Sequence, residues 1–108
     1  MKVEEKLNYI LISDDIEKNA NFEKIEASIK QAEHKNVVLQ ATINNLNKGN
    51  IDRFISISEG KKANGTSFVL VSKEISVDTI PESLNVVPTI TEAEDIIEME
   101  NIERELGF

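Results

Sequence analysis

The clearest indication of the fold lies in residues 37–58, which read VVLQATINNLNKGNIDRFISIS. A short β-branched run from Val37 to Leu39 predicts a buried strand. Apolar residues then recur at helical spacing from Ile51 onwards, and Asn50 is placed to cap that helix. Between the strand and the helix lies an amide-rich turn, residues 43–50. In open α/β folds, a turn that follows the carboxyl end of a strand usually carries the functional groups.

The turn from Ile43 to Asn50 offers amides, one lysine and one glycine, but no Ser, Thr, Cys, His, Asp or Glu. A junction without a nucleophile, acid or base favours a binding module, so we expect no enzymatic activity and no catalytic residues. The residues expected to contact a partner are Asn47, Lys48, Gly49, Asn50 and Arg53. The competing interpretation is a helix cap with a tight turn, because Asn and Gly suit both.

Size and composition limit the classes of protein that this chain can belong to. Its 108 residues, 40% of them apolar, predict one domain with a single modest core. The absence of Cys excludes disulfides, and a single histidine, His34, argues against a His-based metal site, so we expect no metal and no cofactor. The sequence shows no secretory signal and no apolar run of about 20 residues, so we expect a cytoplasmic protein.

The negative charge is concentrated at the C-terminal end. Residues 89–108 hold seven acidic residues and one basic residue, Arg104, and so carry −6 of the net charge of −8. No basic patch balances them. This distribution argues against binding to nucleic acid and against docking on anionic membranes.

The remaining elements alternate between strands and helices. Strands are expected near residues 1–5, 9–13, 68–71 and 85–87, and helices centred near Ile29, Phe54 and Ile96. Asn64-Gly65 should end the second helix. Lys61 and Lys62 should complement the negative end of this helix's dipole. The expected core consists of Ile12, Ile25, Val38, Leu39, Phe54, Ile55, Phe68, Leu70, Val87 and Ile97. The alternation predicts an α/β fold, a mixed sheet of four to five strands with helices packed on it.

Three stretches give the chain its resemblance to a known family. They are the strand, turn and helix of residues 37–58, the segment ANGTSFVLV at residues 63–71, and the segment LNVVPTITEA at residues 84–93. In this order they resemble the STAS domain, the fold of the bacterial anti-sigma factor antagonists. The resemblance covers residues 3–97, and we assign residues 1–97 to a STAS-like domain.

The resemblance implies a regulatory protein that binds another protein, either an anti-sigma-like regulator or a different one. In the family, the turn carries a Ser or Thr that a partner kinase phosphorylates. Asn47, Lys48, Gly49 and Asn50 occupy the matching positions here, and none has a hydroxyl. This turn, which acts as a phosphorylation switch in the family, is therefore expected to be non-phosphorylatable here. An alternative function is a regulatory domain that binds a nucleotide or another small ligand at the same turn.

Other polar residues have simpler interpretations. Asp14-Asp15 is more typical of a solvated turn than of a metal or acid–base pair. His34 should interact with the dipole of a helix end, and Ser56 and Ser58 should be small helix residues rather than nucleophiles. Thr42 is the hydroxyl closest to the turn and a weak candidate for modification.

Residues 98–108 are interpreted as an acidic extension of the last helix. Thr89 with Glu92, or Thr91 with Glu94, can begin this helix as a capping box. Its apolar side should include Ile97 and Met99. Beyond the domain, Ile102, Leu106 and Phe108 continue the apolar spacing and form a candidate interface. This stripe would either fold back on the domain or dock on another chain, with a homodimer as one outcome.

Overall fold

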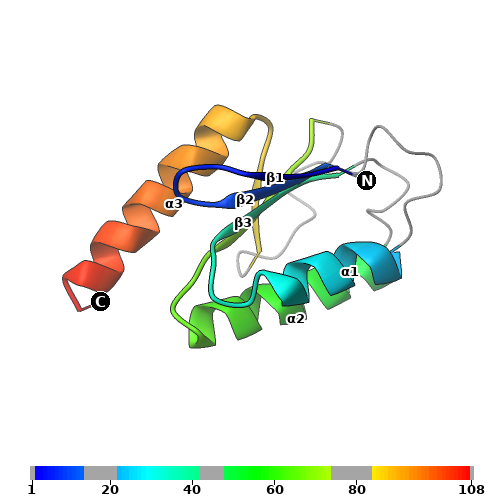
Figure 1. The fold of residues 1–108 in the computed structure, drawn as a ribbon, viewed down its shortest axis with the longest axis horizontal. Helices are drawn as coiled ribbons and strands as arrows, with labels where there is room; N and C mark the ends of the chain where they lie inside the picture. The colour runs from blue at the N-terminus through cyan, green and yellow to red at the C-terminus, as the bar shows by residue number, and fades with distance from the viewer. Residues whose placement is uncertain (1, 14–21, 42–47, 74–83, 108) are drawn as a thin grey trace.

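A computed structural model of the chain describes residues 2–13, 22–41, 48–73 and 84–107. These residues form an α/β fold in which one five-stranded mixed sheet is covered by three helices (Figure 1). The strands are β1 (Lys2–Glu5), β2 (Ile10–Ser13), β3 (Val37–Gln40), β4 (Phe68–Val71) and β5 (Asn85–Val87). The helices are α1 (Phe22–Gln31), α2 (Lys48–Ala63) and α3 (Ile90–Glu105). The predicted fold class is thus confirmed.

The strands lie in the sheet in their order along the chain. β1 and β2 form an antiparallel hairpin, and β2 to β5 are parallel. A parallel connection is almost always right-handed, so strands that are added in one direction place their crossover helices on one face. α1 and α2 accordingly cover one face. α3 follows the last strand, is not a crossover, and covers the opposite face (Figure 1).

The three central strands are buried on both sides because helices cover both faces of the sheet. Alternate positions therefore belong to two separate cores. Ile12, Leu39 and Leu70 are in register and pack with α1 and α2. Leu11 and its neighbours in register, Val38 and Val69, pack under α3.

Most of the predicted core is buried. The residues confirmed are Ile12, Ile25, Val38, Leu39, Phe54, Phe68, Leu70 and Ile97. Ile55 and Val87 were predicted to be buried, but they are only partly so and pack at the edges of the two cores. Met99 was assigned to the same apolar side of its helix as Ile97, but it does not join the core beneath α3 and is 52% exposed.

Of the three predicted helix-end signals that fall within the described residues, two are confirmed. Gly65 has φ 77° and follows α2 as predicted, since glycine adopts this left-handed conformation without a steric penalty. Thr89, rather than Thr91, caps α3, and its hydroxyl accepts a hydrogen bond of 3.2 Å from the backbone N–H of Glu92. The predicted N-cap Asn50 is wrong, because α2 already begins at Lys48 and Asn50 lies in its first turn. The predicted boundary between residues 97 and 98 falls inside α3, which continues without a break to Glu105.

No helix among the described residues is long and apolar enough to cross a membrane.

Candidate functional site

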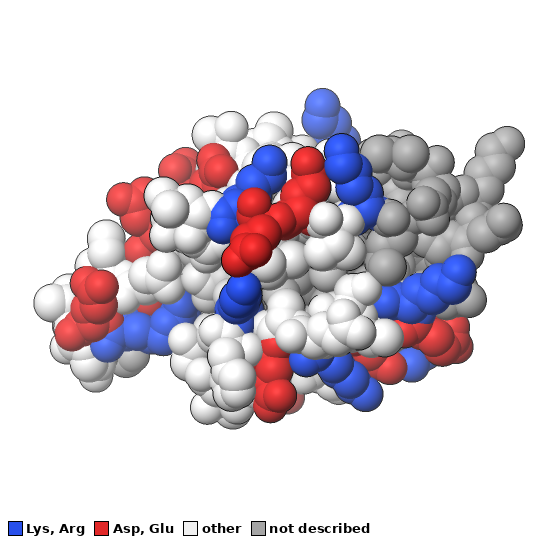
Figure 2. All heavy atoms as spheres, in the orientation of Figure 1, with Lys and Arg blue, Asp and Glu red and all other residues white. Residues whose placement is uncertain are grey.

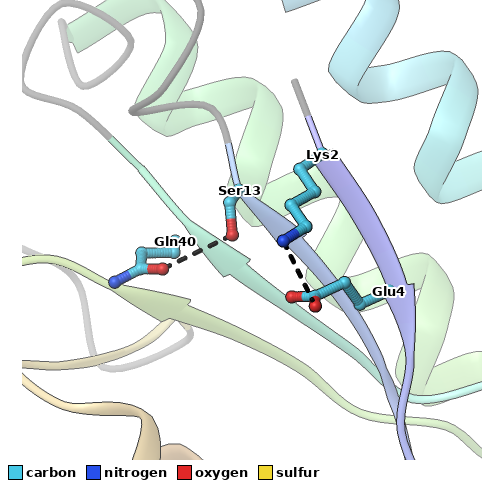
Figure 3. A network of polar contacts seen from close by, with 4 residues as sticks. All are labelled: Lys2, Glu4, Ser13 and Gln40. Atoms are coloured by element: carbon cyan, nitrogen blue, oxygen red, sulfur yellow. Dashed lines mark hydrogen bonds and ion pairs between the residues drawn. The ribbon is translucent and has the colours of Figure 1, made fainter.

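The carboxyl ends of the parallel strands gather at one edge of the sheet, which is where α/β folds place their ligands. Ser13 and Gln40 end β2 and β3 there, and the Ser13 hydroxyl donates a 3.4 Å hydrogen bond to Oε1 of Gln40 (Figure 3). Lys2 and Glu4 of β1 lie beside them and form an ion pair of 3.5 Å. An amide oxygen cannot take a proton from a hydroxyl, so this contact does not activate Ser13 as a nucleophile.

The residues predicted to bind a partner lie at the start of α2, next to this edge. Asn47 lies outside the described residues, whereas Lys48, Gly49, Asn50 and Arg53 all belong to the first two turns of the helix. The Arg53 side chain is exposed and directed toward α1. One of its Nη nitrogens lies 3.2 Å from Oε1 of Glu26, so an ion pair connects the two helices.

Arg53 and Glu26 border a groove of about 550 Å³ between α1 and α2. Ile29 and Ile57 supply apolar surface in it. Its charged residues carry both signs, with three bases (Lys30, Arg53 and Lys61) and two glutamates. The groove is an extension of the predicted site that the sequence did not indicate, because it depends on how α1 and α2 are placed side by side on the sheet.

Lys61 connects α2 to the turn after α1 at the far end of the groove. Only 5% of the residue is exposed, and its ammonium donates hydrogen bonds to the backbone carbonyls of Ala32 and Lys35, the latter at 2.7 Å. Burial lowers the pKa of Lys61, and the charge of Glu33 opposes this shift. The sequence associated Lys61 with the end of its own helix, but its side chain instead binds carbonyls just beyond the end of α1.

The other residues singled out from the sequence are scattered. His34 is exposed in the turn after α1, and Ser56 is exposed on α2. Ser58 is buried against the sheet. Asp14-Asp15 and Thr42 lie outside the described residues. Among the described residues, no three His, Cys, Asp or Glu side chains come together in a way that could hold a metal ion.

Polar contacts fasten α3 to the sheet along its length. Near its start, the Tyr9 hydroxyl donates a 2.7 Å hydrogen bond to Oε2 of Glu94. In the middle, Asn85 donates to Oε2 of Glu100 at 3.0 Å. Near its end, Arg104 donates to the Ser67 hydroxyl at 3.1 Å. The final turns of α3 are therefore attached to the domain even though they lie in the segment predicted to be an extension.

Asn36 connects several segments of the chain near the end of α3. Its Oδ1 accepts a 2.8 Å hydrogen bond from the backbone N–H of Ser67, and its Nδ2 donates to the Asn8 carbonyl at 3.0 Å. Arg104 also approaches Oδ1 of Asn36 at 3.5 Å, and it donates to Oδ1 of Asn101 at 2.5 Å. The amino ends of β2, β3 and β4 are thereby tied to the end of α3.

The titration of Tyr9 offers a direct test of the docking of α3. Burial, then the hydrogen bond to Glu94 and its charge, and last the charge of Glu4, raise the pKa of Tyr9 from 10.0 to about 12. Between these two values the folded chain retains a proton that the unfolded chain loses, so stability should fall as the pH rises from 10 to 12, by about 2 kcal/mol. Because Tyr9 is the only tyrosine, ultraviolet absorbance of the phenolate reports it alone.

We expect an absorbance midpoint near pH 12 for the folded protein and near 10 in concentrated urea. In Tyr9→Phe, which serves as the control, the loss of stability in this window should be smaller than in the wild type. A midpoint near 10 in the folded protein would contradict the buried contact between Tyr9 and Glu94.

The candidate interface at the end of α3 faces outward. Ile102 is 48% exposed and Leu106, the C-cap residue of α3, is 66% exposed. Neither side chain folds back on the domain. Phe108 lies outside the described residues. Docking of this stripe on another chain stays a prediction.

No protein-family model matches the chain, and no curated protein matches it in sequence.

Proposed function

We propose that the chain is a STAS-like regulatory module that binds another protein through the first two turns of α2. The observation that carries this proposal is the position of Arg53 on α2, where it borders the groove between α1 and α2. The order of elements supports it too. A hairpin, a helix, and then a strand, turn and helix precede β4, β5 and a last helix, which is the order on which the resemblance rests.

The surface around Arg53 has the composition of a binding surface. Apolar groups from Ile29 and Ile57 lie within a charged rim, as in protein interfaces with an apolar centre and a polar border. Arginine is enriched among the residues that contribute most to such interfaces. Its present ion pair with Glu26 is exposed and worth at most about 1 kcal/mol, so a partner's carboxylate can replace Glu26 at little cost.

Replacing Arg53 with alanine should weaken partner binding by about tenfold or more. The partner would be captured on the immobilised chain, purified, and titrated against the wild type and the variant by calorimetry. Lys62→Ala is the matched control, since it removes a cation from the last turn of the same helix. Equal affinity for the wild type and Arg53→Ala, or failure to obtain any partner that binds in purified form, would argue against the proposal.

The turn itself should resist phosphorylation by a kinase of the anti-sigma type. The reason is chemical: residues 43–50 contain no hydroxyl that could accept a phosphoryl group. Mass spectrometry after incubation with such a kinase should find no phosphate in this stretch. Stoichiometric phosphate on Thr42 would show instead that the switch is retained at a shifted position.

A second candidate function is binding of a nucleotide or another small ligand in the groove. The observation in its favour is the groove volume of about 550 Å³, within the range of about 300–1,000 Å³ that is usual for small-molecule sites. The charges that line the groove nearly cancel, with Lys30, Arg53 and Lys61 beside Glu26 and Glu33, so it offers a phosphate group no strongly positive site. Melting temperatures measured across a nucleotide panel separate the two functions: a saturable rise that Arg53→Ala removes would favour the ligand.

A further inference from the structure

A second surface, on the opposite face of the sheet from α1 and α2, combines exposed apolar groups with acids. Of the five large apolar side chains exposed among the described residues, four lie on α3, at its C-cap or on the adjacent β1–β2 turn. They are Leu7 (96% exposed), Met99 (52%), Ile102 (48%) and Leu106 (66%), and together we call them the α3 stripe. Exposed apolar groups that gather in one place mark an interaction site more often than scattered ones do.

The α3 stripe has the shape and spacing that an apolar helix face recognises. Met99, Ile102 and Leu106 are separated by three and then four residues, which is the spacing of a coiled-coil seam. A hollow of about 610 Å³ separates this seam from the β1–β2 turn, and both Leu7 and Ile102 line it. A second, smaller hollow of about 280 Å³ lies beside Met99. A helix laid along α3 could place its apolar side chains in these hollows.

The residues around the α3 stripe indicate which charge a molecule bound there must carry. The residues that line the two hollows include five acids, Glu94, Asp95, Glu98, Glu103 and Glu105, and a single base, Lys6. In Figure 2, acidic side chains follow α3 along the upper left of the molecule. These acids border the apolar groups, so any occupant that buries the α3 stripe must bring positive charge to its own rim.

A second copy of this chain does not meet that requirement. In a symmetric dimer the same patch contacts itself, so the acids of one copy would face the acids of the other. Like charges placed across an interface are unfavourable. The stripe is also unsuited to anionic membranes, for the same reason.

We propose that the α3 stripe binds a basic amphipathic helix of a partner protein, whose apolar face covers Leu7, Met99 and Ile102 and whose Lys or Arg side chains pair with the acids of α3. This surface is distinct from the proposed site at α2. It gives the module a second point of attachment, so the chain can bridge two proteins.

The test uses a fluorescein-labelled peptide of about three heptads with Leu at positions a and d and Lys at e and g. Two control peptides accompany it, one with the same residues in scrambled order and one with Glu at e and g. Anisotropy of each peptide is measured against the full chain. The basic amphipathic peptide should bind saturably, and both controls should bind at least about tenfold more weakly. Its affinity should fall as NaCl rises from about 0.05 M to about 0.5 M.

Variants of the chain locate the binding surface. Ile102→Ser should weaken binding of the basic peptide by about tenfold or more. Val3→Ser is the matched control, since Val3 is similarly exposed (52%) but is paired with Ile12, on the face that α1 and α2 cover. Leu7→Ser tests the same surface without altering α3, should Ile102→Ser fail to fold. Arg53→Ala should leave the affinity for this peptide unchanged, which separates this test from that of the α2 site.

Three results would overturn the proposal. The first is absence of saturable binding to the basic peptide. The second is equal binding of the scrambled peptide, or equal affinity of the wild type, Ile102→Ser and Leu7→Ser. The third is a dimer in light scattering that Ile102→Ser converts to a monomer, which would assign the α3 stripe to a second copy of the chain.

Discussion

Replacing Phe54 with alanine should lower the free energy of unfolding by about 3–5 kcal/mol. Phe54 is fully buried between α2 and the sheet. Its ring is stacked on that of Phe68, with the centroids 6.0 Å apart and an angle of 28° between the planes. The truncation removes the buried ring and leaves a cavity beneath the helix that carries the proposed binding residues. A domain of this size is stable by only about 5–15 kcal/mol, so a large part of its stability is at stake.

Urea denaturation followed by circular dichroism measures this loss as a lower midpoint at an unchanged slope. Ser56→Ala is the control on the same helix, because Ser56 is exposed and its replacement should change stability by less than about 0.5 kcal/mol. In the double variant with Phe68→Ala, the two losses should be non-additive by about 0.5–1.5 kcal/mol because the rings are in contact. A loss below about 1 kcal/mol for Phe54→Ala would show that the ring is not in the core.

Replacing Asn36 with alanine should cost about 1–3 kcal/mol, although Asn36 is not in the apolar core. Its Oδ1 is the acceptor for the backbone N–H of Ser67, and Ser67 is fully buried. The substitution leaves that N–H without its acceptor, and it also removes the donor to the Asn8 carbonyl. An unsatisfied buried group loses its hydration without compensation, which is why the effect is large for one small side chain.

Asn36→Asp is the matched control for this prediction. A carboxylate retains the acceptor for Ser67 and faces Arg104, but it loses the donors to the Asn8 carbonyl and to Oδ1 of Asn101. Thermal unfolding should therefore rank the wild type and Asn36→Asp above Asn36→Ala. Arg104→Ala should lower stability by a smaller amount than Asn36→Ala, since its contacts are partly exposed. Equal stability of Asn36→Ala and the wild type would show that the hydrogen bonds of Asn36 to Ser67 and Asn8 do not stabilise the fold.

Much of the fold could be read from the sequence because its signals are local. Strands such as Phe68–Val71 are short apolar runs between turn residues, and Gly65 marks the end of α2 through its own conformational freedom. The helical spacing of Ile51, Phe54 and Ser58 likewise identifies the buried face of α2. In each case the residues that produce the signal lie within a few positions of the structure that they specify.

The site depended on contacts that only the tertiary structure creates. Lys61 donates hydrogen bonds to the carbonyls of Lys35 and Ala32, which lie 26 and 29 positions away along the chain. Asn36 accepts a hydrogen bond from Ser67, which lies 31 positions away. Neither pairing leaves a periodic or spacing signal in the sequence. Met99 was predicted to lie on the apolar side of its helix from local spacing alone. The core beneath α3 contains Ala93 and Ile97, with Ile90 and Ile96 at its edge, and it leaves Met99 exposed.

The order and type of the elements, and most of the apolar core, could be read from the sequence alone. So could the lack of a hydroxyl in the turn at residues 43–50. These properties depend on local conformational preference and on which atoms are present. Three features emerge only when the elements pack together. α1 and α2 share one face of the sheet, and a groove lies between them beside Arg53. The last turns of α3 are bound to the domain while Met99, Ile102 and Leu106 stay exposed. The physical reason is that burial and long-range hydrogen bonds depend on the packing of whole elements, which no short stretch of sequence specifies.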